Sequence, residues 1–164
     1  YIDTSININS HYKIMEESLS KKMIFNLFEH NINVGGLSKN VIPIITKSEE
    51  AFSILKENQF HFVFIDANHH YPYCYNDIVS SQSLVIDNGV LCGDDLELQY
   101  EDVKDILNDD LIRNIDCHPG LTESTYFHPG VTYSVWKFAN RKISAQNGFW
   151  ALRKANGSFI DWNF

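Results

Sequence analysis

Two apolar runs of the sequence each stop abruptly at acidic residues. The first run, 61–65, ends at Asp66, and the second, 90–92, is closely followed by Asp94 and Asp95. In an open α/β sheet, the carboxyl ends of the parallel strands face the crevice where ligands bind. Carboxylates from two neighbouring strand ends could share one hard divalent cation such as Mg²⁺. Alternatively, these acids only cap the loop and the helix that follow them.

A histidine lies close to the first of these acids. His69 follows Asp66 by three residues. An imidazole beside a cation and a substrate hydroxyl could act as a general base, because its pKa lies near neutrality. Alternatively, it is a loop histidine that bonds a backbone carbonyl. We therefore predict catalytic roles for His69 and Asp66. Other histidines offer no such argument beyond their position, namely His11, His30, His61, His118 and His128.

The elements that must position these residues alternate along the chain. Helices are predicted at 12–31, 48–57, 73–84, 100–107 and 131–138, and strands at 1–3, 41–45, 62–65 and 90–92, with an irregular loop at 114–130 and a final hairpin, 149–154 with 158–162. Asn156 and Gly157 give the hairpin its turn signal. Ser48 is the predicted N-cap of its helix. This order favours one α/β domain over 1–164, with a mostly parallel sheet, helices on both faces and a C-terminal antiparallel hairpin.

Composition narrows the possible partners and surroundings. The chain has 164 residues and a formal net charge of -8, which weighs against a nucleic-acid backbone or an anionic membrane as main partner. No apolar run is long enough to predict a spanning helix. Three cysteines without metal-ligand spacing fit free thiols in a reducing compartment, so a cytoplasmic location is expected. Composition leaves the oligomeric state open.

Glycine-rich phosphate loops are missing from the sequence. Neither GxGxxG nor GxxxxGK[ST] occurs. A dinucleotide or nucleoside triphosphate site of the usual kind is therefore not predicted.

The segments IDANHHY at 65–71 and NGVLCGDD at 88–95, with HPG at 128–130, carry a resemblance to a known family. The pattern resembles the class I S-adenosylmethionine-dependent methyltransferases, and is most similar to the small-molecule O-methyltransferase branch described as methyltransferase domain 24. The resemblance covers about residues 1–154 and implies a Rossmann-like fold. It also implies a divalent cation, with Mg²⁺ preferred, held by Asp66, Asp94 and Asp95. The base in such enzymes can come from the loop that contains His69.

The same resemblance implies where the methyl donor binds. Asp3 matches the acid that contacts the ribose of S-adenosylmethionine, and Ser48 falls where the adenine is usually contacted. The first strand and the Gly-rich donor loop of the family are expected before residue 1. We therefore expect an N-terminally truncated domain, inactive by itself, or else a degenerate homologue or a domain completed by another polypeptide.

The predicted function is transfer of a methyl group from S-adenosylmethionine to a hydroxyl of a small molecule or sugar, assisted by a divalent cation. One alternative is a non-catalytic methyltransferase-like module that binds ligands or serves as a scaffold. A second alternative is a metal-dependent hydrolase that uses the same carboxylates. A variable acceptor loop does not reveal its ligand by composition, so the acceptor itself is not predicted.

Overall fold

The computed structural model describes residues 13, 17–18, 23–122 and 125–162. The chain divides into two compact units, 1–45 and 46–164, which are described separately. Among the described residues, none of the helices combines the length and the apolar character needed to cross a membrane. The strand predicted at 1–3 lies outside the described residues.

The first unit contains helix α2, Met23–Val34. The helix ends three residues beyond the predicted 31, where Gly35 donates its amide to the Asn31 carbonyl at 2.9 Å and Gly36 takes a φ of 69°. The strand predicted at 41–45 is wrong, because this segment has no strand hydrogen bonding. Pro43 removes one backbone donor from the segment, and β-branched residues alone do not supply a pairing partner.

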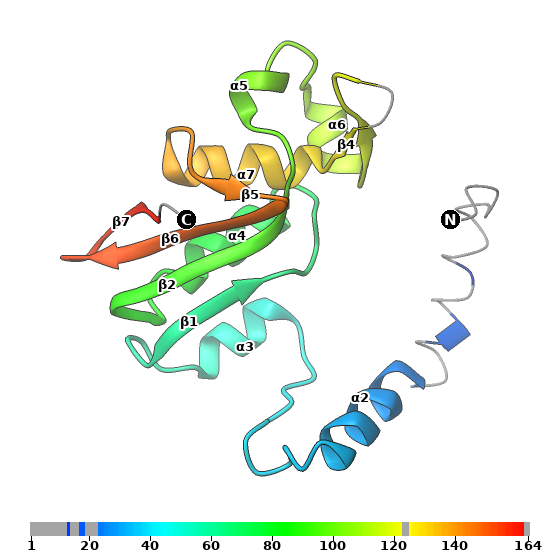
Figure 1. Cartoon of the computed structure of the whole chain (residues 1–164), viewed down its shortest axis with the longest axis vertical. Coiled ribbons are helices and arrows are strands. Elements are labelled where there is room, and N and C mark those ends of the chain that lie inside the picture. Colours follow the sequence, from blue (N-terminus) through cyan, green and yellow to red (C-terminus); the bar gives the residue numbers. More distant parts are fainter. Residues whose placement is uncertain (1–12, 14–16, 19–22, 123–124, 163–164) are drawn as a thin grey trace. The chain divides into compact units, whose positions relative to one another are not determined.

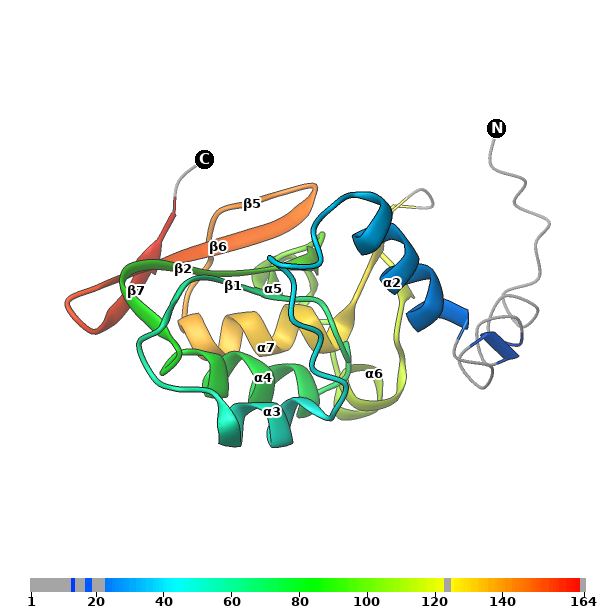
Figure 2. The same cartoon turned by 90° about the horizontal axis from the view of Figure 1, so that it is seen from below.

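The second unit contains the sheet and its helices (Figure 1). Its helices are α3, Ser48–Ile54; α4, Tyr73–Ser81; α5, Tyr100–Val103; α6, Asp109–Asn114; and α7, Pro129–Ala139. Its strands are β1, Phe60–Ile65; β2, Val85–Leu96; β3, His118–Pro119; β4, Tyr126–Phe127; β5, Ala145–Gln146; β6, Gly148–Ala155; and β7, Ser158–Asp161. Helices α3, α4 and α7 lie on one face of the sheet (Figure 2).

The sheet is mixed, with the strand order β1-β2-β6-β5 and with β7 paired to β6. Strands β1 and β2 run parallel, whereas β6 is antiparallel to β2, β5 and β7. The prediction of a mostly parallel sheet is therefore corrected for the described residues, where one pair is parallel. The C-terminal antiparallel hairpin is confirmed, and Asn156 and Gly157 take the φ values of 52° and 76° that its tight turn requires.

Strand β2 is much longer than the predicted 90–92. Asn88 and Gly89, a pair that commonly forms turns, instead lie inside the strand as an irregularity, where Asn88 has a φ of 66° and the register against β1 shifts. A second shift, against β6, falls between Gly93 and Leu96. The acids Asp94 and Asp95 thus lie inside an irregular stretch of strand rather than just beyond its end.

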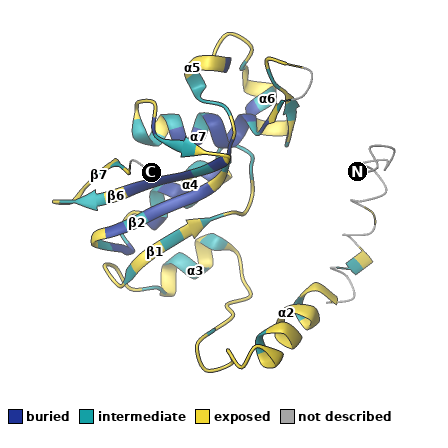
Figure 3. Ribbon diagram, in the orientation of Figure 1, coloured by how far each residue is buried: buried dark blue, intermediate teal, exposed yellow. Residues whose placement is uncertain are grey.

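The core is formed where the sheet meets α4 and α7 (Figure 3). Its fully buried side chains include Ile78, Leu91, Trp150 and Leu152. Each such burial removes enough apolar surface to stabilise the fold by about 1.5–3 kcal/mol. Strand β1 is an apolar run, but its residue Phe62 is 57% exposed, so only one face of β1 packs on the core.

Smaller differences from the predicted elements concern their ends. Helix α5 is shorter than the predicted 100–107, and α7 begins at Pro129, two residues earlier than predicted. The predicted loop 114–130 contains the short β3–β4 pair.

The three cysteines, Cys74, Cys92 and Cys117, are free thiols.

Candidate functional site

The parallel pairing of β1 and β2 brings the predicted acids to one edge of the sheet. Ile65 is the register partner of Gly93, so Asp66 and Asp94 follow neighbouring positions on adjacent strands. Gly93 makes this approach feasible, because a Cβ there would lie 2.6 Å from the Ile65 carbonyl oxygen and 2.8 Å from the Trp150 ring. A larger residue at Gly93 would force the strands and the indole apart.

Asp95 is turned toward the interior of this edge by an unusual backbone conformation. Its φ is 66°, in the left-handed region that non-glycine residues rarely adopt. The turn is fixed locally, because the Asp95 amide donates to Asp94 Oδ1 at 2.9 Å and the Trp150 indole donates to the Asp94 carbonyl at 3.3 Å. Such strain costs about 1–3 kcal/mol and persists where the surroundings hold it, often at functional sites.

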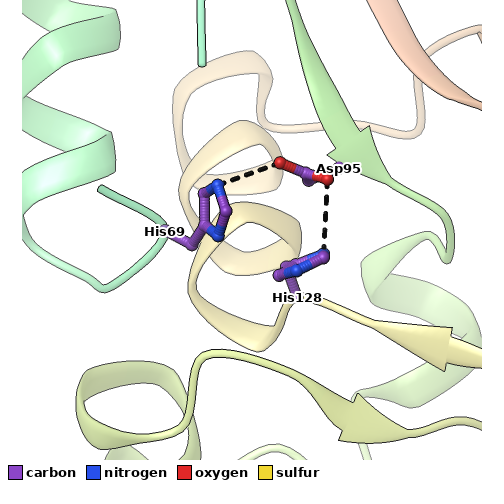
Figure 4. A group of neighbouring side chains, drawn as sticks. All are labelled: His69, Asp95 and His128. Atoms are coloured by element: carbon purple, nitrogen blue, oxygen red, sulfur yellow. Dashed lines mark ion pairs between the residues drawn. The ribbon is translucent and has the colours of Figure 1, made fainter. Parts of the chain in front are cut away.

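His69 has a carboxylate beside each ring nitrogen. Its Nε2 lies 3.0 Å from Asp95 Oδ2 (Figure 4), and its Nδ1 lies 2.9 Å from Asp116 Oδ1. Asp66 Oδ1 lies further away, 4.0 Å from the same Nε2. To accept a proton from a substrate, the imidazole would have to exchange its contact with Asp95 for one with the substrate.

His128, which the sequence analysis gave no role, lies directly beside this pair. Its Nδ1 is 3.0 Å from Glu97 Oε1 and 3.6 Å from Asp95 Oδ1 (Figure 4). The rings of His69 and His128 meet edge to face, with 4.6 Å between their centroids. The backbone amide of His128 also donates to Glu97 Oε2 at 3.3 Å, so Glu97 holds this residue at two points.

Hydrogen bonds and burial in the cluster shift the pKa values of His128, Glu97 and Asp95. The hydrogen bond to Glu97 raises the pKa of His128 above its usual 6.5. Burial acts to raise the pKa of Glu97, but its bonds with His128 outweigh this and lower it. Burial raises the pKa of Asp95, although the two histidines oppose the shift. The environment therefore disfavours the charged form of Asp95 and favours that of Glu97.

Gly130 explains why His128 reaches the cluster. A Cβ at Gly130 would lie 2.2 Å from the His69 carbonyl oxygen and 2.8 Å from that of Ile112. The absence of a side chain lets the first turn of α7 pack against the loop after β1, and Pro129 is suited to the start of that helix. In the sequence, the His-Pro-Gly tripeptide at 128–130 was the one feature that marked His128.

The same tripeptide occurs at 118–120, but there the histidine is placed differently: His118 Nδ1 contacts the neighbouring Pro119 carbonyl at 2.7 Å.

The predicted catalytic and metal-binding residues line one narrow pocket. Its volume is about 10 Å³, roughly the space of a single water molecule. Its lining includes Asp66, His69, Asp94 and Asp95, together with Cys74, Val131 and Trp150. Burial raises the pKa of the Cys74 thiol to about 12, so this thiol is not available as a thiolate ligand or nucleophile near neutral pH.

A tighter group exists within this region. In the part of the chain that the structure describes, His69, Asp95 and His128 are the residues that can each place a ligand atom within 4.8 Å of the others. Asp66 and Asp94 line the pocket but do not belong to this group. Of the three predicted metal ligands, the structure therefore brings Asp95 together with two imidazoles.

The predicted donor-binding residue Ser48 lies in a separate pocket. It is the first residue of α3 instead of its N-cap, which is Lys47, and its hydroxyl lies 3.4 Å from Asp77 Oδ2. The pocket has a volume of about 310 Å³, and Asn68, from the loop after β1, also lines it. The other predicted donor-binding residue, Asp3, lies outside the described residues.

A wide open groove lies on the other side of Glu97. Its volume is about 920 Å³, and its polar lining includes Glu97, Gln99, Asp102 and Lys142. Glu97 is thus shared between this groove and the histidine cluster. The arrangement offers space for a small molecule beside a cluster of proton-accepting and metal-binding groups.

Comparison with known proteins places the chain in a family. Residues 5–96, more than half of the chain, match the sequence profile of a family described as a methyltransferase domain. The match contains Asp66, His69 and Asp95 but stops before His128. No curated protein matches the chain, and no solved structure does. The matched residues include β1, the loop after it and β2, which position Asp66, His69 and Asp95, and the chain belongs to this family of methyltransferase domains.

Proposed function

We propose that the protein transfers the methyl group of S-adenosylmethionine to a hydroxyl of a small molecule or sugar, with the assistance of a divalent cation. One observation carries this proposal. Within the segment that matches the methyltransferase family, Asp66, His69 and Asp95 line the same narrow pocket at the edge of the sheet. These groups can accept the proton that a hydroxyl loses on methylation and can hold a cation that would assist that loss.

The chemistry divides between donor and acceptor. S-adenosylmethionine supplies a methyl group on a positively charged sulfur. The acceptor oxygen forms a bond to that methyl group as the sulfur–carbon bond breaks, and the electron pair of the broken bond stays on sulfur. The hydroxyl proton must leave to a nearby base, for which His69 and Asp66 are the candidates. Holding acceptor and donor in line supplies a large part of the rate enhancement.

The pocket at Ser48 supports the placement of the donor. Its volume of about 310 Å³ lies at the lower end of small-molecule sites and suits the adenosyl portion. Tyr73 and Phe52 give it aromatic lining, while Asn68 connects it with the loop that carries His69. Asp3 remains the proposed ribose contact.

The groove beside Glu97 supports the placement of the acceptor. Its lining side chains include Gln99, Asp102 and Lys142, which can exchange hydrogen bonds with a polyhydroxylated molecule. The groove reaches Gly148, where a Cβ would lie 3.0 Å from Asp94 Oδ1, so the groove and the acidic edge are neighbours. A cation held by Asp95 and its neighbours would lower the pKa of an acceptor hydroxyl.

The proposal is tested with the full-length protein and S-adenosylmethionine that carries a radiolabelled methyl group. A panel of catechols, sugars and other hydroxylated compounds serves as acceptors, and both labelled product and S-adenosylhomocysteine are measured. We expect O-methylated product. We also expect Asp95→Asn to lower turnover by about 100-fold or more. Asp87→Asn is the matched control, because Asp87 lies in the same strand at its opposite end.

Two other results would overturn the proposal in different ways. Tight binding of S-adenosylhomocysteine without turnover across the panel would favour a non-catalytic binding module. Hydrolytic turnover in the absence of any methyl donor would favour a metal-dependent hydrolase.

A further inference from the structure

We propose that His69, Asp95 and His128 form a binding site for a divalent transition metal such as Zn²⁺, in place of the all-oxygen magnesium site that the sequence predicts. The three residues come from the loop after β1, the end of β2 and the start of α7 (Figure 4). They are far apart in the sequence, so their convergence is a property of the fold. The inference rests on the proposed function for the use of the ion and on geometry alone for its binding.

The separations of the ligand atoms fit one ion. Zinc binds imidazole nitrogen and carboxylate oxygen at about 2.0–2.2 Å, which places neighbouring ligand atoms about 3–3.5 Å apart. His69 Nε2 and Asp95 Oδ2 are 3.0 Å apart. All three ligand atoms lie within 4.8 Å of one another, so rotations of the side chains suffice to complete the set.

Two further carboxylates hold the imidazoles in place. Asp116 Oδ1 lies 2.9 Å from His69 Nδ1, which directs the other ring nitrogen toward Asp95. Glu97 contacts both the ring and the backbone amide of His128. For His69 this matches the usual arrangement of metal-binding histidines, in which a partner on the nitrogen that does not bind the ion fixes the tautomer and the ring orientation. Glu97 instead meets His128 at Nδ1, the nitrogen that also lies 3.6 Å from Asp95 Oδ1, and so holds the residue as a whole in position.

Charge and exposure favour a cation with a free coordination position. The side chains of His69, Asp95 and His128 are 24%, 23% and 16% exposed, so the group is largely screened from solvent and still partly accessible. Three acidic side chains, Asp95, Asp116 and Glu97, surround the two imidazoles. With only three protein ligands, a bound ion would keep a position for water or for a substrate oxygen, as in catalytic metal sites.

The types of ligand decide which metal is preferred. Imidazole suits zinc, iron, nickel and copper, whereas magnesium and calcium prefer oxygen ligands. Two imidazoles and one carboxylate therefore favour Zn²⁺ over Mg²⁺. With His69 engaged as a ligand, Asp66 becomes the proton acceptor of the proposed reaction, since it is 55% exposed and lies only 4.0 Å from His69 Nε2.

The test measures metal binding without any requirement for activity. Full-length protein freed of metal is titrated with Zn²⁺ and separately with Mg²⁺ by calorimetry, and with Co²⁺ by visible absorption. We expect Zn²⁺ to bind one site per chain, and Mg²⁺ to compete poorly. His128→Gln should weaken Zn²⁺ binding by about 10–100-fold or more. His118→Gln is the matched control, because His118 occupies the same position in the other His-Pro-Gly tripeptide.

Folding and function are separated from binding by three further measurements. Circular dichroism checks that each variant folds, and His69→Gln provides a second ligand variant. An absorption band typical of tetrahedral or five-coordinate Co²⁺ that is lost in both ligand variants would support the site. Equal Zn²⁺ affinity in wild type, His128→Gln and His69→Gln would overturn it.

The inference and the proposed function can fail independently. Zinc binding without methyl transfer would leave the metal site standing and remove the proposed function. Methyl transfer by a protein whose Zn²⁺ affinity is equal in wild type, His128→Gln and His69→Gln would retain the function and overturn the metal site.

Discussion

The two ends of the β1–β2–β6 sheet are built by different means. At one end, β6 and β7 meet in a tight turn, and Lys154 Nζ donates to the Val85 and Gln82 carbonyls at 2.7 and 3.1 Å. At the other end, His69, Asp95 and His128 converge from separate elements. At the first end, the Lys154 side chain satisfies backbone carbonyl groups by hydrogen bonding. The second end gathers acidic side chains around two imidazoles.

The backbone shows the same contrast. At the hairpin end, positive φ values fall on Asn156 and Gly157, which form a tight turn and are exposed. At the site end, a positive φ falls on Asp95, whose pKa is raised by burial. A residue that is both strained and partly desolvated reduces stability, and proteins keep such residues mainly where they serve function. The comparison predicts that substitutions at the two ends have separable effects on stability and on binding.

The largest expected effect on stability is that of Gly130→Ala, at the site end. The new methyl group would overlap the His69 carbonyl oxygen, since its Cβ would lie 2.2 Å away. Separating α7 from the loop should cost about 3 kcal/mol of unfolding free energy and displace His128. Urea denaturation and Zn²⁺ titration of the same variant would measure both losses. A variant of normal stability and affinity would show that α7 does not pack as described.

A smaller effect is expected for Lys154→Met at the hairpin end. The substitution keeps most of the aliphatic length but removes the hydrogen bonds to Val85 and Gln82. We expect a loss of about 1–2 kcal/mol in unfolding free energy, since the part-buried carbonyls lose a charged donor. Methyl transfer and metal affinity should not change. A loss of activity in well-folded Lys154→Met would break the distinction between the two ends.

Gly157→Ala should have a still smaller effect, again at the hairpin end. Its φ of 76° is costly for any residue with a Cβ, although nothing lies within 4 Å of the added atom. The expected loss is about 1 kcal/mol, from backbone strain alone. Thermal unfolding beside Gly130→Ala provides the comparison. If both variants lost the same stability, close packing at Gly130 would not be what distinguishes the site end.

The smallest predicted effect concerns pH and the Glu97–His128 pair. The raised pKa of His128 contributes stability fully below its unfolded value of 6.5, and this contribution is lost as pH rises through the folded pKa. The lowered pKa of Glu97 contributes stability fully above its unfolded value of 4.5, and this contribution is lost as pH falls through the folded pKa. Both contributions are therefore complete between 4.5 and 6.5.

Glu97→Gln measures this contribution in metal-free protein. Because the Glu97 side chain is 32% exposed, the difference from wild type should be only about 0.5–1 kcal/mol within this window. It should shrink as the pH rises through the raised pKa of His128, above which His128 is neutral in both proteins. Urea denaturation within this window and over a series of higher pH values checks the prediction, and a difference that stays constant with pH would contradict the assigned pair.

The hairpin end could be predicted from the sequence because its determinants are local. Asn156 and Gly157 specify their turn by themselves. The sequence likewise predicted that β1 ends before Asp66 and that a helix starts at Tyr73, because an apolar run stops at the first place and a helical pattern begins at the second. In these places the interactions that decide the structure join residues close together in the chain.

Elsewhere, long-range contacts decided the outcome. Asn88 signalled a turn, but β2 continues through it because Val85 before it and Val90 after it both pair with β1. His128 reaches the cluster only because Gly130 lets α7 approach the loop after β1. The spacing of apolar residues along the chain does not indicate which distant segments pack this closely. The acidic edge could therefore be predicted, whereas the second imidazole could not.

The most direct test of the central claim, that the site end is the active site, is a crystal structure of the full-length protein with S-adenosylhomocysteine bound. We predict that the adenosyl group occupies the pocket lined by Ser48 and Asn68, with the sulfur facing the edge that carries His69 and Asp95. S-adenosylhomocysteine bound elsewhere, with its sulfur remote from these two residues, would contradict the account.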